Sequence, residues 1–278
     1  MIISYREYKP STDLQPYVES YWYQEFDGNN DEESPLQVCL PLGMAQIIIN
    51  LEGDKCLVGT DGNVQYLPEI FVVGLYTDKV IWKTKGHSTY FGICLKPESI
   101  ERLFKAPVST MFNGYAELSC FLDKSIHSFT DSLFGAADVY KLIDASEQFL
   151  RSRLSLNYST KPYLAAATDI IRNSKGQISV DQLCKTLYVS ERQLQRSFKE
   201  VYGTGPKTYT RIIRFRHAYE YAQQVKNDNL SWLDISHSFG YADQAHFIRD
   251  FKQFTGTIPS SIVAEGNQFY QLSNITDQ

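Results

Sequence analysis

The sequence lacks the features that mark membrane and secreted proteins. No apolar run approaches the roughly 18–20 residues that a membrane-spanning helix needs. The opening MIISYREYKP does not have the basic-then-apolar order of a signal peptide. Cysteines are few, an odd number of five, and no two stand in a C-x-x-C spacing. This pattern favours free thiols in a reducing compartment over a disulfide framework, so we expect a cytoplasmic protein.

Motifs of catalysis and metal binding are also missing. The chain has no G-x-S-x-G, P-loop, G-x-G-x-x-G or H-E-x-x-H pattern. Histidine is scarce, and the first half holds only His87 and His127, far apart in sequence. Protein metal sites need clustered ligands. The sequence therefore predicts no metal, no cofactor and no enzyme active site.

Charge is distributed unevenly along the chain. Residues 1–160 hold 13 Lys and Arg against 21 Asp and Glu, a net charge of −8, whereas residues 161–278 hold 14 against 11, a net charge of +3. A basic segment is a candidate for binding a polyanion such as nucleic acid, although charge runs more often form a solvated face. The division suggests two parts with different tasks.

Short runs rich in β-branched and aromatic residues dominate the first half and predict strands. The turn residues Gly53-Asp54, Asp61-Gly62 and Lys85-Gly86 separate them, and Asp61-Gly62 is typical of a hairpin. Helical spacing begins at Pro97 and again over 138–154. Regular strand spacing predicts a β-barrel or sandwich with flanking helices. The predicted strands are 46–51, 57–60, 65–67, 70–74, 80–83 and 89–96.

The second half shows only helical patterns, so the whole chain is predicted to be α+β with two domains. Ser179 begins a capping-box pattern with Gln182, and Ser190 begins another with Gln193. Two capped helices separated by a short turn are typical of a helix-turn-helix unit, although any helical hairpin gives the same pattern.

An internal repeat shows that this unit occurs twice. Residues 196–206 recur as 249–259, with Arg, Phe, Lys, Gly, Thr and Pro identical at one offset of 53. Both copies end with Gly and a following Pro, which terminate helices. Residues 207–224, between the copies, predict a linker helix. An all-α domain with two reading helices on one connector could enter successive major grooves, about 34 Å apart.

These segments together carry a family signature. Its residues are Ile178-Ser-Val-Asp-Gln-Leu183, Leu194-Gln-Arg-Ser-Phe-Lys199 and Phe239-Gly-Tyr-Ala-Asp-Gln-Ala-His-Phe-Ile-Arg-Asp-Phe-Lys252 with Gly256 and Pro259. The last run is similar to the pattern G-[FY]-x-[DS]-x-S-[HY]-F-x-R-x-F-K…G-x-x-P of the AraC/XylS family of bacterial transcription regulators. The resemblance covers residues 163–262. Two departures are Ala245, where serine is common, and Tyr188, which replaces the turn glycine of the first unit.

The resemblance implies which side chains meet DNA. Arg and Gln pair with base edges, while Lys, hydroxyls and helix N-termini meet phosphates. Candidate base contacts are Arg192, Gln195, Arg196, Gln244, His246 and Arg249. Candidate backbone contacts are Ser190, Lys199, Arg211, Arg214, Asp243 and Lys252.

Several of these candidates also have a purely structural interpretation. Arg196 and Arg249 hold matching repeat positions and could instead be ion-pair partners within the protein. His246 lies three residues after the expected cap Asp243 and could simply hydrogen-bond it. The helical core is expected to hold Phe198, Phe247 and Phe251.

The first half resembles, more loosely, the β-rich sensor and dimerisation domains of the same family. The match runs through Leu14-x-x-Tyr17-Val18-x-x-Tyr21-Trp22, Pro41-x-Gly43 and Phe91-Gly-Ile-x-Leu-x-Pro97. The resemblance implies a cupin-like β-barrel or sandwich that binds a small-molecule effector, forms a homodimer, or does both. Candidate effector contacts are the contiguous aromatics Tyr21, Trp22 and Tyr23. The alternative for this half is a packed barrel or a dimer face.

The combined prediction is a sequence-specific DNA-binding transcriptional regulator, an activator by family habit, that works with RNA polymerase at the bacterial nucleoid. We expect a β-rich domain at 1–158, the DNA-binding domain at 163–264 and a tail at 265–278. Two other hypotheses stay open. Cys39 could be the reactive thiol of a DNA-repair or thiol-reactive enzyme that uses the helix-turn-helix half for delivery. The chain could also be a protein–protein module that no longer binds DNA.

Overall fold

The computed structural model describes residues 2–58, 63–122, 125–154, 161–224 and 231–260. The described strands are β1 (Ile2–Tyr8), β2 (Val18–Asp27), β3 (Gln37–Cys39), β4 (Ala45–Val58), β5 (Val64–Tyr66), β6 (Ile70–Val73), β7 (Val80–Leu95) and β8 (Tyr115–Glu117). The described helices are α1 (Pro97–Phe104), α2 (Ser125–Phe134), α3 (Val139–Leu154), α4 (Pro162–Asn173), α5 (Val180–Leu187), α6 (Glu191–Tyr202), α7 (Pro206–Gln224), α8 (Trp232–Ser238) and α9 (Gln244–Thr255), with short 3₁₀ turns η1 (Val108–Met111) and η2 (Leu118–Cys120).

The strands form one antiparallel sheet in the order β1-β2-β7-β4-β6-β8, with β3 added to β7 and β5 added to β4. The α+β class and the all-helical second half are confirmed. The predicted barrel is wrong, because the sheet is open: the edge strands β1 and β8 do not pair with each other in the described residues. Strand β8 has only three residues, too few to close a barrel against β1.

Two glycines that predict turns instead lie inside long strands. Strand β4 runs through Gly53, and β7 runs through Gly86, so the predicted turns at these positions are wrong. The two strands pair with each other, and their register shifts around Glu52. Both glycines have positive φ, +85° and +67°, as expected at a bulge. The predicted Asp61-Gly62 hairpin turn lies outside the described residues.

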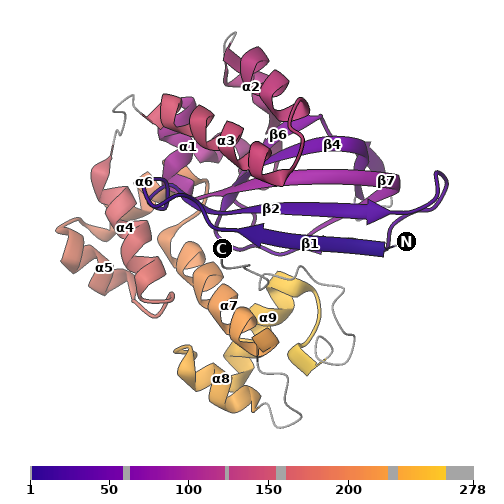
Figure 1. Ribbon diagram of the computed structural model, residues 1–278. Coiled ribbons are helices and arrows are strands. Elements are labelled where there is room, and N and C mark those ends of the chain that lie inside the picture. The colour runs from indigo at the N-terminus through magenta and orange to yellow at the C-terminus, as the bar shows by residue number, and fades with distance from the viewer. Residues whose placement is uncertain (1, 59–62, 123–124, 155–160, 225–230, 261–278) are drawn as a thin grey trace.

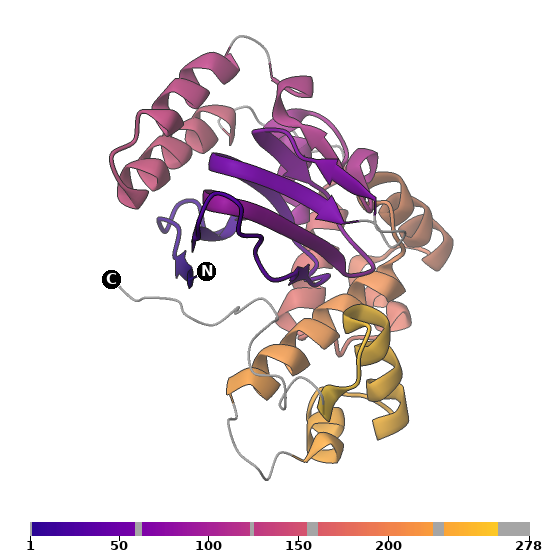
Figure 2. The same ribbon diagram turned by 90° about the vertical axis from the view of Figure 1, so that its right-hand side faces the viewer.

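Alternate residues of the strands pack on opposite faces of the sheet. On β4, Ile47 and Ile49 belong to a cluster shared with α1 and α3. Ile48 points to the other face, where it joins an aromatic cluster that includes Trp22 and Trp82. Helices α2 and α3 lie on one side of the sheet, and α7–α9 on the opposite side (Figures 1 and 2).

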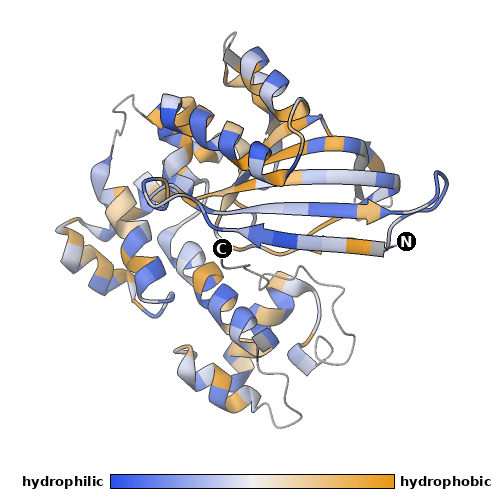
Figure 3. Cartoon of the chain, in the orientation of Figure 1, coloured by the Kyte–Doolittle hydropathy of each residue, from blue (hydrophilic) through white to orange (hydrophobic). Residues whose placement is uncertain are grey.

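The hydrophobic clusters of the helical half include residues of the sheet domain. The large cluster beneath the sheet continues into α4, α6 and α7 through Leu164, Phe198 and Ile213. A second cluster, around α7, α8 and α9, contains Leu40 and Leu42 from the N-terminal half. Each helix of the C-terminal half carries both hydrophobic and hydrophilic residues (Figure 3). Part of the hydrophobic surface of these helices is therefore buried against the sheet domain.

The predicted domain boundary lies partly, and the predicted tail wholly, outside the described residues. The predicted boundary falls at residues 159–162, of which 159 and 160 lie outside the described residues, and α4 begins at Pro162. The predicted tail, 265–278, also lies outside them. No helix in the described segments is long and apolar enough to cross a membrane.

Candidate DNA-binding surface

The first helix-turn-helix unit consists of α5 and α6. Ser179 and Gln182 form the predicted capping box at α5. The hydroxyl of Ser190 accepts a hydrogen bond from the backbone N–H of Gln193, at 3.2 Å, at the start of α6. Tyr188 forms the turn at φ +54°, a left-handed conformation that favours glycine, and its side chain is 96% exposed. The local chemistry thus builds the predicted unit, with one strained turn residue.

The second unit, α8 and α9, repeats this design. The hydroxyl of Ser231 accepts from the backbone N–H of Asp234, at 3.2 Å. The carboxylate of Asp243 accepts from the backbone N–H of His246, at 2.6 Å. Both α6 and α9 end on a glycine in the left-handed conformation. The sequence repeat is therefore a repeat of local structure.

Helix α7 links the two units and fixes their relative position. The guanidinium of Arg211 donates to the carboxylate of Asp250 on α9, at 2.6 Å. Asp250 is 2% exposed, so Arg211 supplies the counter-charge of a buried carboxylate. The Nε of Arg214 donates to the backbone carbonyl of Gly176, at 2.8 Å, just before the first unit. One helix therefore makes polar contacts to both units.

Most of the predicted base contacts are available on the surface. Five of the six side chains are exposed and form no hydrogen bond or ion pair within the described part of the chain: Arg192, Gln195, Arg196, Gln244 and Arg249. Arg196 and Arg249 could instead have been ion-pair partners within the protein, but neither forms an ion pair among the described residues. The exposed Arg and Gln side chains stand on the two reading helices, α6 and α9.

His246 differs from the other five. Its ring lies edge-on to Tyr241, with the centroids 5.2 Å apart, and its Nε2 is 4.0 Å from a carboxylate oxygen of Asp250. Its backbone N–H, rather than its imidazole, bonds the cap Asp243. The imidazole is thus turned partly toward the protein.

The predicted backbone contacts fall into three groups. Ser190 and Asp243 are helix caps, as described above. Lys199 donates to the carbonyl of Gly203, at 2.7 Å, and lies 5.3 Å from the ring centroid of Phe112 in the N-terminal half. The side chain of Lys252 is exposed and makes no hydrogen bond or ion pair inside the described segments. The remaining two, Arg211 and Arg214, hold the units to α7.

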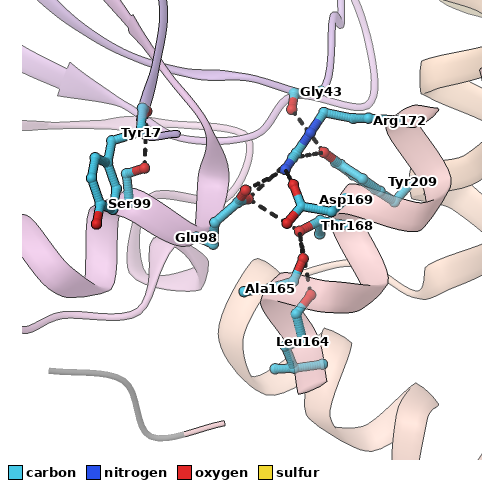
Figure 4. Close-up of polar contacts among 10 residues, drawn as sticks. All are labelled: Tyr17, Gly43, Glu98, Ser99, Leu164, Ala165, Thr168, Asp169, Arg172 and Tyr209. Atoms are coloured by element: carbon cyan, nitrogen blue, oxygen red, sulfur yellow. Dashed lines mark hydrogen bonds and ion pairs between the residues drawn. The ribbon is translucent and has the colours of Figure 1, made fainter. Parts of the chain in front are cut away.

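A polar cluster joins the DNA-binding half to the sheet domain (Figure 4). Arg172 on α4 forms an ion pair with Glu98 on α1, and its Nη1 donates to Glu98 at 3.1 Å. The same Nη1 donates to the hydroxyl of Tyr209 on α7, at 3.2 Å. That hydroxyl donates in turn to the carbonyl of Gly43, at 3.3 Å. Residues from both halves therefore complete one network, which is partly buried.

A second polar link lies further along α7. Arg216 donates to Glu19 of the sheet domain, at 2.8 Å, and to Glu220 on its own helix, at 2.7 Å. Burial favours the neutral acid at Glu220, but His217 and Arg216 outweigh it and lower the pKa of that carboxyl. Neither link is signalled by the sequence, because the partners that join the two halves are far apart along the chain.

The predicted effector contacts are packed in the sheet domain. Tyr21 stacks on Phe91, with the ring centroids 6.0 Å apart, and is fully buried. The indole N–H of Trp22 donates to Gln46, at 3.0 Å. Tyr23 bonds Glu25, at 3.0 Å, and burial first, then this bond, raises the pKa of Tyr23 to about 12. None of the three lines the cavity that opens beside β3 and β4.

Cys39 is the thiol on which the alternative enzymatic hypothesis depends. Cys39 is half-buried and its sulfur accepts a hydrogen bond from the indole of Trp82, at 3.1 Å. The described residues contain no group of three or more His, Cys, Asp or Glu that could hold a metal ion.

Comparison with known proteins agrees with this geometry. Residues 183–264 match a family described as a helix-turn-helix domain, and residues 6–117 match a domain of unknown function, DUF6597. The probable transcription factor PqrA of Proteus vulgaris is 32% identical over 89 residues, which are 32% of this chain and 70% of PqrA. The chain belongs to the AraC/XylS family of transcriptional regulators. Proteins of this family are not enzymes.

Other relatives of this AraC-family chain match it over a longer stretch. The Msm operon regulatory protein of Streptococcus mutans is 29% identical over 160 residues. That match spans 56% of each protein, so the chain aligns with just over half the length of this relative. Among solved structures, ToxT from Vibrio cholerae aligns with 88% of this chain and 97% of its own, at 10% identity and a TM-score of 0.46.

Proposed function

We propose that the chain is a sequence-specific DNA-binding regulator that reads two successive major grooves with α6 and α9. The observation that carries this proposal is the matched set of free Arg and Gln side chains on the two capped helices. Unpaired, exposed groups of this kind suit bidentate contacts to guanine and adenine. Helix α7 holds the two units through part-buried hydrogen bonds, which favours a fixed spacing between the two reading helices.

The proposal assigns the side chains as follows. The base contacts are Arg192, Gln195, Arg196, Gln244, His246 and Arg249. The backbone contacts are Ser190, Lys199, Arg211, Arg214, Asp243 and Lys252. Arg211 and Arg214 would reach phosphate only with the N–H groups that their internal partners leave free. His246 would have to turn from Tyr241 toward the groove.

The same proposal extends to the partners of the DNA complex. As an activator, the chain would act through RNA polymerase at the promoter, and its place of action would be the cytoplasm, at the nucleoid. A small-molecule effector would bind the N-terminal half. Side chains of that half belong to both hydrophobic clusters of the DNA-binding half, which supports a role of the N-terminal half in controlling it. One chain covers two grooves, and a homodimer would cover four.

Selection of binding sites from random DNA with purified full-length protein, read at two salt concentrations, tests the proposal. We expect a motif with two blocks about 10 base pairs apart. Weak, sequence-blind binding that disappears with salt would contradict it.

Single substitutions then assign the blocks. Arg196→Ala should relax preference at one position in one block, and Arg249→Ala in the other, each at a cost of about 1–3 kcal/mol. Lys141→Ala, an exposed change on α3, serves as the control and should leave the motif unchanged. Unaltered motifs in both arginine variants would remove these two assignments.

A further inference from the structure

The C-terminal ends of the two reading helices meet the sheet domain at equivalent positions. Helix α6 ends at Gly203 and α9 ends at Gly256, two glycines separated by the same offset of 53 residues that relates the two units. A Cβ added at Gly203 would lie 2.5 Å from Phe112, and one added at Gly256 would collide with the Nζ of Lys79. Phe112 and Lys79 both belong to the sheet domain, so this domain contacts the same end of each reading helix.

The contact at α6 combines packing with a hydrogen bond. The hydroxyl of Ser109 donates to the backbone carbonyl of Glu200, at 2.6 Å. Carbonyls in the last turn of a helix have no partner within the helix, so this bond satisfies one of them. The ring of Phe112 lies beside Gly203 and 5.3 Å from the Nζ of Lys199. The sheet domain therefore holds the C-terminal end of α6.

The contact at α9 is electrostatic and apolar. The exposed side chain of Lys79 extends across Gly256, and its ammonium makes no hydrogen bond or ion pair with any described residue. The last carbonyls of a helix carry partial negative charge, which a nearby cation stabilises. Leu40 and Leu42, which follow β3, join the hydrophobic cluster of the second unit. The sheet domain thus holds α9 as well.

The two contact points are parts of one tied structure, residues 74–79 and 109–114, which we call the bridge. The side-chain Oδ1 of Asn113 accepts from the backbone N–H of Thr77, at 2.8 Å. The backbone N–H of Asn113 donates to the carbonyl of Leu75, at 2.9 Å. Strands β6 and β8 also pair beside these residues. Because the two segments are bonded together, the ends of α6 and α9 are held by a single rigid element.

The bridge leaves the reading side chains accessible. Recognition helices contact base edges mainly through residues near their N-termini. Arg192, Gln195 and Arg196 lie in the first half of α6 and are exposed, whereas the bridge contacts the opposite end of the helix. Two units joined by α7 alone could still twist about that helix, and a second connection between them removes this freedom. The bridge can therefore fix the two helices while they bind DNA.

We propose that the bridge sets the separation of α6 and α9 and thereby restricts the chain to DNA sites with one spacing between the two blocks. Phe112 and Lys79 are then positioning residues and not DNA contacts. The inference rests on the proposed DNA-binding function, because it specifies which sites that function accepts. One added base pair moves the second block by about 3.4 Å and rotates it by about 35°, which two helices fixed to each other cannot follow.

The separation of the helices in the free protein tests the bridge without DNA. Genetically encoded spin labels at Gln193 on α6 and Ala245 on α9, both exposed, give a distance distribution by pulsed electron paramagnetic resonance. We expect a narrow distribution for the native chain and one about twofold broader for Phe112→Ala, because several arrangements are then populated. Phe112→Tyr keeps the ring and should restore the narrow distribution. Equal widths for the native chain and Phe112→Ala would overturn the proposal.

The effect on DNA recognition is measured with the selected two-block site and with versions that have one base pair added or removed between the blocks. The native chain should bind the altered sites about tenfold more weakly, because the DNA must deform to fit. For Phe112→Ala this loss should shrink to about threefold or less. Phe121→Ala is the matched control, since it removes another half-buried ring of the sheet domain, one that packs on Phe104, and it should keep the native preference.

Lys79→Ala gives a second variant that does not depend on a buried side chain. Because Lys79 is exposed, the substitution should leave the fold intact and still reduce the spacing preference. An unchanged preference in both Phe112→Ala and Lys79→Ala would overturn the proposal and assign the spacing to α7 alone. A native chain with no sequence-specific binding, but with a helix separation that depends on Phe112, would contradict the proposed function and support the bridge as a connection.

Discussion

The hydroxyl of Tyr209 donates a hydrogen bond to the backbone carbonyl of Gly43, 3.3 Å away. Tyr209 lies on the helix that links the two helix-turn-helix units, and Gly43 lies in the sheet domain. The same hydroxyl accepts from Arg172. This buried contact joins the linker helix to the segment just before β4, so it connects the two halves of the chain.

Gly43→Ala should destabilise the protein by about 2 kcal/mol. Gly43 has φ +70°, where an L-residue is strained, and its added Cβ would lie 2.7 Å from Ile213. The free energy of unfolding in urea measures the change. Gly114→Ala is the matched control, because a Cβ added there would meet its nearest non-neighbouring atoms at 3.9 Å, and it should stay within about 0.5 kcal/mol. Equal effects of the two substitutions would contradict the tight contact.

Arg211→Ala should cost about 3–5 kcal/mol of stability, because it leaves the carboxylate of Asp250 buried without its partner. Thermal and urea unfolding measure this loss. The double change Arg211→Ala with Asp250→Asn should recover part of it, since no charge then remains unpaired. Lys207→Ala, an exposed substitution on the same helix, should be nearly neutral. A neutral Arg211→Ala would contradict the structural role of the pair.

Tyr188→Gly should stabilise the chain by about 0.5–1 kcal/mol. The residue has φ +54°, which glycine adopts without steric cost, and its 96% exposed side chain loses little packing. Tyr188→Ala keeps the strain and should give no such gain, which separates backbone strain from loss of the ring. Unfolding free energies of the three proteins provide the comparison.

Lys199→Ala should weaken binding to all DNA sequences alike and lower the slope of log affinity against log salt by about 0.9. The reason is that a phosphate contact neutralises charge without reading bases. Fluorescence anisotropy at several salt concentrations measures the slope. A changed sequence preference with the same salt slope would instead assign Lys199 to base recognition.

Local patterns predicted most of the helical half. Caps at Ser179 and Ser190 depend on residues three positions apart, and terminal glycines act on the turn before them, so a linear pattern contains this information. The turn predictions at Gly53 and Gly86 were wrong because they depended on long-range strand pairing, which a local pattern does not contain. A glycine with positive φ serves a turn or a bulge equally well, and only the pairing of β4 with β7 decides between them.

Candidate side chains on α6 and α9 were also predictable, because the repeat aligns them and their exposure follows from helical periodicity. The ion pair of Arg172 with Glu98 was not, and neither was the contact of Tyr209 with Gly43. These partners are separated by 74 and 166 residues. No local pattern specifies which distant residue a buried group will meet.

Residue patterns over a few neighbouring positions are enough to predict the two capped helix-turn-helix units, their linker helix and a β-rich first half. Long-range packing, by contrast, leaves the sheet open and places Leu40 and Leu42 in the core of the second unit. Hydrophobic burial is non-directional, so apolar residues from any part of the chain can fill a core, and the packing of the whole molecule selects which ones do.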